Sequence, residues 1–195
     1  MKVAVIGVQG DVEEHVVMTE KALNELGISG EVYPVRRSGI ASRCDALIIP
    51  GGESTTISKL IWRDGIAEEI IELAESGHPV MGTCAGLIII SKYGDDQVKR
   101  TETKLLGLLE AKVKRNAFGR QRESFEAVLN VDGIGQYNAI FIRAPSVEET
   151  GKNVRVLAMF EDKVVAVRER NILGLSFHPE LTDDTRVHRY FLSLI

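Results

Sequence analysis

The chain of 195 residues is long enough to bury a full hydrophobic core, since 44% of its side chains are hydrophobic. Its 24 basic and 28 acidic side chains leave a net charge of -4 and are interleaved along the chain, which argues against a nucleic-acid partner. No apolar run approaches the ~20 residues that a membrane span needs, and the N-terminus lacks a small-residue cleavage site. We therefore expect a cytoplasmic protein with a single domain over residues 1–195 and no membrane partner.

The first half of the chain alternates apolar runs, typical of buried strands, with segments of helical spacing. Strands are predicted over residues 2–8, 31–36, 45–50 and 79–83. Helices are predicted over residues 12–27, 55–61, 66–77 and 85–92. This βαβ succession indicates a parallel sheet covered on both faces.

The second half consists mainly of short strands separated by Gly, Asp and Asn. They are predicted over residues 109–116, 124–131, 139–145, 154–160, 163–170 and 172–179, and a last helix over residues 183–194. Between the halves, residues 94–104, "GDDQVKRTETK", match no motif and are expected to form a polar loop. The chain is thus predicted to be an α/β protein with three layers, in which a mostly parallel central sheet has helices on both faces and antiparallel strand additions.

Four of the predicted strands end in unusual residues. These stretches are "QGD" (9–11), "PGGEST" (50–55), "TCAG" (83–86) and "HPE" (178–180). In a doubly wound sheet, ligands and chemistry gather beyond the carboxyl ends of the strands, so these four stretches are the candidate functional site.

Cys84 lies where a predicted strand must turn sharply into a helix, and Gly82 and Gly86 make that turn sterically possible. The arrangement resembles a nucleophile elbow, in which the side chain sits at a helix N-terminus and the next N–H, here that of Ala85, points at a developing oxyanion. A helix N-terminus also favours the thiolate, the reactive form of cysteine. The alternative is a small cysteine packed between strand and helix, which is the expectation for Cys44. Neither belongs to a Cys-x-x-Cys pair, so both thiols are expected to be free.

A cysteine nucleophile needs a base, and His178 is the best candidate among the histidines. It ends an apolar strand and precedes a proline that keeps it extended, so His178 and Glu180 project on the same side. One ring nitrogen can then face Cys84 while Glu180 holds the other, as in a catalytic triad. The alternative is a turn with a surface acid. His15 and His188, on the first and last predicted helices, are expected to be packing or surface residues.

The paired glycines of "PGGEST" let the backbone come close to a ligand with its N–H groups free. The Gly52 N–H is the expected partner of the Ala85 N–H in an oxyanion hole. Ser54 and Thr55 can cap the following helix, so the alternative is an ordinary strand-to-helix turn. The stretch is not a phosphate loop, because no Gly-Lys-Ser/Thr follows it.

Taken together, "PGGES", "GTCAGL" and "FHPE", in this order and spacing, resemble the class I glutamine amidotransferases. Further stretches extend the resemblance over essentially the whole chain, namely residues 7–15, 51–61, 82–90, 115–126, 141–145 and 176–184. With them, the sequence is similar to the glutaminase subunits of pyridoxal 5'-phosphate synthases. The triad motifs specify only the superfamily, whereas "RNAFGRQ" and "QGDVEEH" point to this family.

The resemblance implies a specific reaction, in which Cys84 attacks the carboxamide of L-glutamine, releases ammonia and leaves a glutamyl thioester that water hydrolyses. The implied triad is Cys84, His178 and Glu180. The family's glutamine contacts fall on Gly52, Glu53, Ser54, Arg115, Ile142 and Arg143. Gln9 is expected to contact the active site or the partner when a complex forms.

Ammonia would mostly become non-nucleophilic ammonium in neutral water, so its transfer calls for an enclosed path to a second site. The sequence shows no phosphate loop, metal cluster or synthase domain, so a partner is expected. By resemblance it is a (β/α)8-barrel synthase subunit, in a hetero-oligomer that makes pyridoxal phosphate from ribose 5-phosphate, glyceraldehyde 3-phosphate and ammonia. No cofactor and no metal are expected in this chain, because pyridoxal phosphate is the product of the complex.

Three other functions share some of these features. A glutaminase subunit of another pathway, such as histidine or purine synthesis, has the same triad. A cysteine hydrolase or redox-protective protein of similar α/β architecture uses the same elbow. A non-catalytic binding or regulatory subunit can keep the fold, although the intact Cys84, His178 and Glu180 argue against it.

Overall fold

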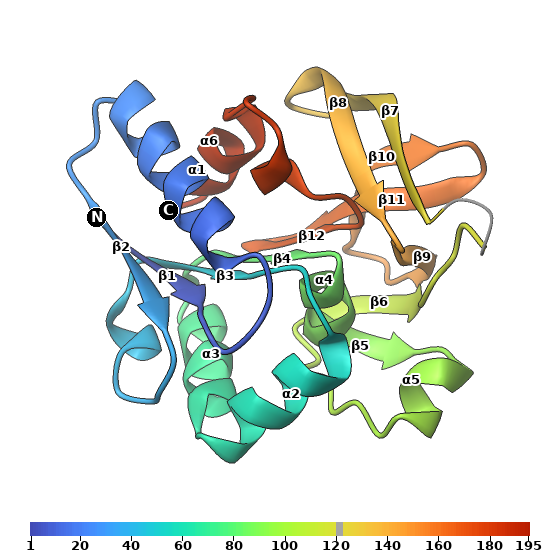
Figure 1. Cartoon of the computed structure of the whole chain (residues 1–195), viewed down its shortest axis with the longest axis horizontal. Coiled ribbons are helices and arrows are strands. Elements are labelled where there is room, and N and C mark those ends of the chain that lie inside the picture. The colour runs from blue at the N-terminus through green and yellow to red at the C-terminus, as the bar shows by residue number, and fades with distance from the viewer. Residues whose placement is uncertain (120–122) are drawn as a thin grey trace.

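The computed structural model describes residues 1–119 and 123–195, with one large sheet at its centre and helices around it (Figure 1). The strands of the first half are β1 (Lys2–Ile6), β2 (Glu31–Val35), β3 (Ala46–Ile49), β4 (Val80–Thr83) and β5 (Ser91–Gly94). Those of the second half are β6 (Leu109–Lys114), β7 (Ser124–Val131), β8 (Gly135–Ile142), β9 (Ser146–Thr150), β10 (Arg155–Phe160), β11 (Lys163–Glu169) and β12 (Ile172–Leu175). The helices are α1 (Val12–Glu25), α2 (Ser54–Arg63), α3 (Ile66–Glu75), α4 (Ala85–Ile90), α5 (Asp96–Arg100) and α6 (Arg186–Leu192), with short 3-10 helices η1 (Ala41–Arg43) and η2 (Pro179–Leu181).

The large sheet runs in the order β2-β1-β3-β4-β12-β11-β9-β6-β5, with β10 paired to β11. Its first five strands are parallel. The strands of the second half add to it mainly in antiparallel pairs, and β7 and β8 form a separate antiparallel hairpin. The predicted α/β class, with a mostly parallel sheet and antiparallel additions, is confirmed.

Both faces of the parallel sheet are covered, which explains why its strands are apolar at every position. In β1, Ala4 and Ile6 belong to the core beneath α2, α3 and α4, whereas Val3 and Val5 belong to the core beneath α1 and α6. Figure 1 shows these two groups of helices on opposite sides of the sheet. Within the described ranges, no helix combines the length and the apolar character that crossing a membrane requires.

Two strands lie where none was predicted. The helix predicted to reach residue 92 ends at Ile90, and Ser91 begins β5, which pairs with β6. The Ser91 hydroxyl donates a hydrogen bond to the Leu87 carbonyl at 2.7 Å and so satisfies a terminal acceptor of the helix. The second unexpected strand, β9, pairs with both β6 and β11. Both strands are short and are defined by partners distant in sequence.

The prediction of a polar loop over residues 94–104 is wrong, because this segment contains α5. The Asp95 carboxylate accepts the N–H groups of Gln97 and Val98, both at 3.0 Å, and thereby caps the helix. Val98 is 3% exposed and joins the core beneath α4. A cap and one buried anchor therefore make a helix of a segment whose composition is polar.

We expect Gly86→Ala to lower the free energy of unfolding by about 2–3 kcal/mol, because a Cβ at Gly86 would lie 2.1 Å from the Ile49 carbonyl oxygen. The control is Gly27→Ala, where a Cβ meets nothing within 4 Å and only the left-handed backbone, φ +67°, costs energy, about 1 kcal/mol. Urea denaturation measures both variants. Equal losses would contradict the close contact between α4 and β3.

Candidate active site

The four unusual strand ends meet at one edge of the sheet, around a cavity of about 360 Å³. Its lining includes Cys84, Ala85 and His178, as well as every residue to which the family's glutamine contacts were assigned: Gly52, Glu53, Ser54, Arg115, Ile142 and Arg143. Asp11, Ile88 and Asn116 complete it. The volume falls in the range of small-molecule sites. Gln9 does not line this cavity.

Cys84 lies at the apex of the turn between β4 and α4. Its backbone is left-handed, with φ 49° and ψ -102°, a strained conformation for a residue other than glycine. The surroundings hold it there, because the Cys84 N–H donates to the Leu175 carbonyl at 2.8 Å and a Cβ on Gly82 would lie 2.5 Å from Gly86. The side chain is 8% exposed, and its thiol donates to the Ile142 carbonyl at 3.6 Å.

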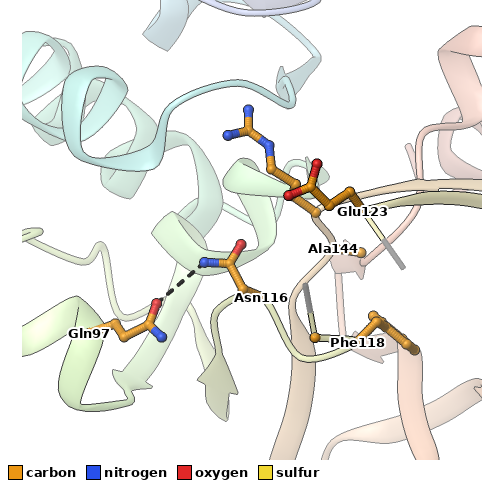
Figure 2. Close-up of a pocket in the computed structure, with 7 residues that line it drawn as sticks. Gln97, Asn116, Phe118, Glu123 and Ala144 are labelled. Carbon is orange, nitrogen blue, oxygen red and sulfur yellow. Dashed lines mark hydrogen bonds between the residues drawn. The ribbon is translucent and has the colours of Figure 1, made fainter. Parts of the chain in front are cut away.

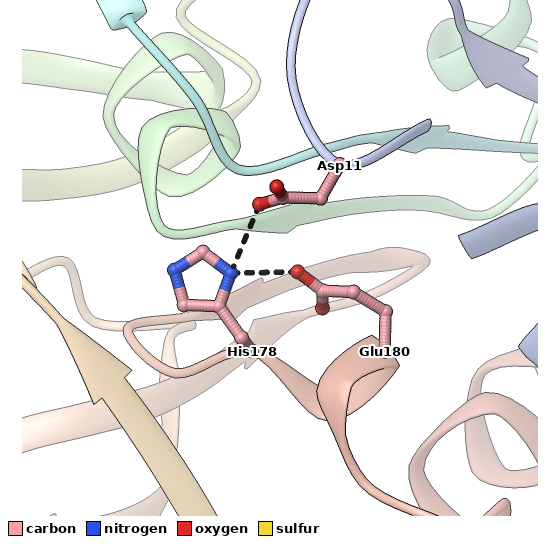
Figure 3. Close-up of side chains that lie close together, drawn as sticks. All are labelled: Asp11, His178 and Glu180. Carbon is pink, nitrogen blue, oxygen red and sulfur yellow. Dashed lines mark hydrogen bonds and ion pairs between the residues drawn. The ribbon is translucent and has the colours of Figure 1, made fainter. Parts of the chain in front are cut away.

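His178 and Glu180 form a buried pair beside Cys84. His178 Nδ1 lies 2.6 Å from Glu180 Oε1 and 3.3 Å from Asp11 Oδ2, and Figure 3 shows both carboxylates at this one nitrogen. Burial opposes the charged imidazole, but the neighbouring Asp11, Cys84 and Glu180 together raise the pKa of His178 above its ordinary value. Burial raises the pKa of Glu180, against the opposing effect of its hydrogen bond to His178.

The second ring nitrogen of His178 is available for chemistry. In Figure 3 it points away from both carboxylates, and it is buried without a hydrogen-bond partner among the described residues. Cys84 and His178 line the same cavity, and Cys84 also contributes to the raised pKa of His178. A thiol proton can therefore pass to Nε2 while the carboxylates at Nδ1 support the resulting imidazolium.

The same carboxylates argue against a metal centre. Ligand atoms of Asp11, His178 and Glu180 lie within 4.8 Å of one another. However, Nδ1 of His178, which faces both carboxylates, is held by the 2.6 Å hydrogen bond to Glu180 and would have to lose it to bind a metal ion. The geometry favours a hydrogen-bonded triad, and the absence of a metal stays a prediction.

The loop that follows β3 packs tightly against His178 and the loop after β1. A Cβ on Gly51 would lie 2.4 Å from His178 Cε1, and one on Gly10 would lie 1.9 Å from the Gly51 carbonyl oxygen. Gly52 has φ +145°, and the Glu53 N–H that follows donates to Gln9 Oε1 at 2.9 Å. Gln9 thus holds the loop that carries the predicted oxyanion donor.

Arg115 is held over the cavity by contacts that its sequence neighbourhood did not indicate. Its guanidinium lies 3.2 Å from Glu53 Oε1 and 3.3 Å from Thr101 Oγ1. Its backbone N–H donates to Asp95 Oδ2 at 3.0 Å. Asp95, which caps α5, and Thr101 at its end therefore hold Arg115 at the cavity. The segment 94–104 thus has a structural role in the site.

A second cavity, of about 390 Å³, adjoins the first and shares Asn116 and Arg143 with it (Figure 2). Asn116 Nδ2 donates to Gln97 Oε1 of α5 at 3.4 Å. None of the described residues that line this cavity is a cysteine, serine or threonine, so we place the chemistry in the cavity of Cys84. The end of the "RNAFGRQ" stretch, residues 120 and 121, lies outside the described residues.

Several side chains near the site were not identified from the sequence. Asp11 belongs to the "QGD" stretch. The only sequence signal for Asp11 was the position of that stretch at the end of a predicted strand. His15 and His188 are fully buried, not surface residues; His15 Nδ1 lies 3.2 Å from His188 Nε2, and His15 Nε2 lies 3.0 Å from Thr83 Oγ1. Helical spacing alone could not separate these histidines from ordinary packing residues.

The buried histidines predict a loss of stability in acid. Burial lowers the pKa of His188 from 6.5 to about 4, so only the unfolded chain takes up this proton between those values. The contribution of His188 to the free energy of unfolding is fully present above pH 6.5. It falls by about 3 kcal/mol as the pH is lowered to about 4. We expect His188→Gln to flatten the fall in unfolding free energy between pH 6.5 and 4, measured by urea denaturation. Parallel curves for the two proteins would contradict the buried neutral imidazole.

Comparison with known proteins gives the family. Residues 5–195 match the SNO glutamine amidotransferase family. The chain is 69% identical to the pyridoxal 5'-phosphate synthase subunit PdxT of Archaeoglobus fulgidus, over 100% of this chain and 98% of that protein. It is 53% identical to the PdxT subunit of Methanocella arvoryzae, with the same coverage.

Solved structures agree with this relationship. A crystal structure of a glutamine amidotransferase superposes with a TM-score of 0.88 at 48% identity, covering 98% of this chain and 97% of that one. PurLQS from Thermotoga maritima, at 17% identity and a TM-score of 0.65 over 98% of this chain and 97% of that one, shares the fold alone. With a match over nearly its whole length and relatives of high identity, the chain belongs to the SNO glutamine amidotransferase family.

Proposed function

We propose that this chain is the glutaminase subunit of a pyridoxal 5'-phosphate synthase and that it hydrolyses L-glutamine to glutamate and ammonia. Membership of a glutamine amidotransferase family supports the reaction, and full-length relatives that carry the synthase-subunit name support the pathway. The observation that carries the proposal is the meeting of the Cys84 elbow with the buried His178 and Glu180 pair at one cavity.

Each member of the triad has a defined step. The Cys84 thiol gives its proton to His178 Nε2, and the sulfur attacks the carboxamide carbon of glutamine. The N–H groups of Gly52 and Ala85 stabilise the oxyanion. The tetrahedral intermediate collapses as His178 returns the proton to the leaving nitrogen, so ammonia departs and a glutamyl thioester remains. His178 then deprotonates a water molecule that cleaves the thioester, and Glu180 holds the imidazole throughout.

Charged groups around the cavity suit the two ends of free glutamine. Arg115 and Arg143 can bind its α-carboxylate, while the Glu53 carboxylate and the Ile142 carbonyl can accept from its α-ammonium. Glu53 pairs with Arg115 at 3.2 Å. Binding of a zwitterion replaces part of that contact with two matched ones, which favours a free amino acid over a peptide.

The product defines the partner. Because ammonia has to reach a second active site without protonation in bulk water, we assign it to a (β/α)8-barrel synthase subunit in a hetero-oligomer. The contact of Gln9 with the Glu53 N–H makes Gln9 a residue through which docking can adjust the oxyanion loop. The continuity of the sheet from β2 to β5 supports a single domain over residues 1–195. A cytoplasmic location stays a prediction.

The other functions considered have less support. A glutaminase for purine or histidine synthesis would share the fold, yet the likeness to PurLQS is only 17% identity. A stand-alone cysteine hydrolase or a non-catalytic subunit does not account for relatives at 69% and 53% identity that are named synthase subunits.

The decisive test is Cys84→Ala in the reconstituted complex with the barrel subunit. Glutamine-dependent product formation should fall by at least about 1000-fold, because the nucleophile is removed. Ammonium chloride should still support pyridoxal phosphate formation at the wild-type rate, measured by absorbance of the product. Cys44→Ala, at the other buried thiol, is the matched control and should retain glutamine turnover. Full glutamine activity in Cys84→Ala would overturn the mechanism.

Asp95→Ala tests the placement of Arg115. We expect the KM for glutamine to rise about fivefold with kcat nearly unchanged, since the change loosens a substrate contact and not the triad. Loss of the α5 cap should also lower the unfolding free energy by about 1 kcal/mol. The neighbouring Asp96→Ala, whose side chain is 88% exposed, serves as the control in the same glutamate-release assay. Equal KM values for the two variants would show that α5 does not position Arg115.

A further inference from the structure

Glu180 is held between two histidines. Its Oε1 oxygen lies 2.6 Å from His178 Nδ1, and its Oε2 oxygen lies 3.2 Å from Nε2 of His15, on α1. The carboxylate is 4% exposed and His15 is 0% exposed. Oε2 has no hydrogen-bond partner among the described residues, and its contact with His15 Nε2 is electrostatic.

The tautomer of His15 follows from these contacts. A lone pair on Nε2 would face the Oε2 lone pairs of Glu180 at 3.2 Å and repel them, which favours the tautomer with the proton on Nε2. That N–H donates to the Thr83 hydroxyl, 3.0 Å away, and its positive end also lies beside Glu180 Oε2. Burial and the neighbouring His188 and His178 lower the pKa of His15 well below its ordinary value, which keeps the ring neutral.

A neutral His15 protonated on Nε2 has an acceptor at Nδ1. His188 Nε2, 3.2 Å from this atom, is then the donor. His188 Nδ1 is buried without a partner among the described residues, as expected for the unprotonated nitrogen of a neutral ring. In this tautomer the hydrogen bonds run in one direction, from His188 to His15 and from His15 to Thr83, and the His15 N–H also lies beside Glu180.

We infer that His15 is a positioning residue for the glutaminase reaction, which orients Glu180 and stabilises its charge from the side opposite His178. The inference rests on the proposed function. A buried carboxylate with a second N–H dipole beside it stays ionised more readily, and an ionised Glu180 supports the His178 imidazolium that pairs with the Cys84 thiolate. The other titratable groups that act on Glu180 are Asp11 and Tyr137.

The test compares His15→Met, which fills the volume without a donor, with His15→Gln, whose amide can donate at the place of Nε2. In the complex, His15→Met should lower kcat for glutamine about tenfold with KM unchanged, and His15→Gln should restore most of it. The pH midpoint for alkylation of Cys84 by iodoacetamide, followed by peptide mass spectrometry, should rise by about one unit in His15→Met. This second measurement needs no glutamine turnover.

Thr19→Val is the matched control, because the Thr19 hydroxyl is buried one turn along α1 and donates only to the His15 carbonyl, at 2.6 Å, among the contacts of the described residues. It should lower stability without moving kcat or the alkylation midpoint. A His15→Met variant that behaves like Thr19→Val would overturn the inference, as would a His15→Gln variant that is no better than His15→Met.

The tautomer of His15 can be measured in the wild-type protein. Long-range ¹H–¹⁵N spectra of histidine-labelled protein should show His15 protonated on Nε2, and protonation on Nδ1 would overturn the inference even if His15→Met does not fold. Absence of glutamine turnover by the wild-type complex would instead refute the proposed function. The two failures are therefore distinguishable.

Discussion

The contact between Gly82 at the end of β4 and Gly86 in α4 is the constraint on which the site depends. A Cβ at Gly82 would lie 2.5 Å from the Gly86 backbone, and a Cβ at Gly86 would lie 2.1 Å from the Ile49 carbonyl oxygen. The close approach bends the chain so sharply that Cys84 takes a left-handed conformation, φ 49°. Six buried residues of α4 anchor this turn in the core. Packing of the core thus maintains the strained backbone of Cys84 and fixes its thiol at the cavity.

The second constraint is electrostatic. Glu180 is almost completely buried, and a carboxylate in that position is tolerated only if donors surround it. His178 and His15 lie at its two oxygens, and they come from segments far apart in the sequence. Thr83, the last residue of β4 and the neighbour of Cys84, accepts the His15 N–H. Thr83, His15, Glu180 and His178 therefore form one buried polar network next to Cys84, and the ends of β4 and β12 together with α1 and α6 set its geometry.

The residues proposed to bind glutamine are held differently from the proposed triad. Arg115 and Glu53 are held by surface loops and by the short helix α5, and they pair with each other across the cavity. The residues proposed to bind glutamine therefore lie apart from the proposed triad, beside Gln9 and the loop that carries Gly52.

Apolar continuity and helical spacing were sufficient to predict the parallel strands, the helices between them and the class of the fold, because these signals are local and repeat within each element. The motifs at the strand ends also indicated Cys84, His178 and Glu180 as neighbours, since parallel strands end at one edge. The strands β5 and β9 and the helix α5 were not predicted, because long-range pairing and a single cap define them. Only the tertiary structure placed His15 against Glu180 and Asp95 against Arg115, since contacts between distant segments leave no periodic trace in the sequence.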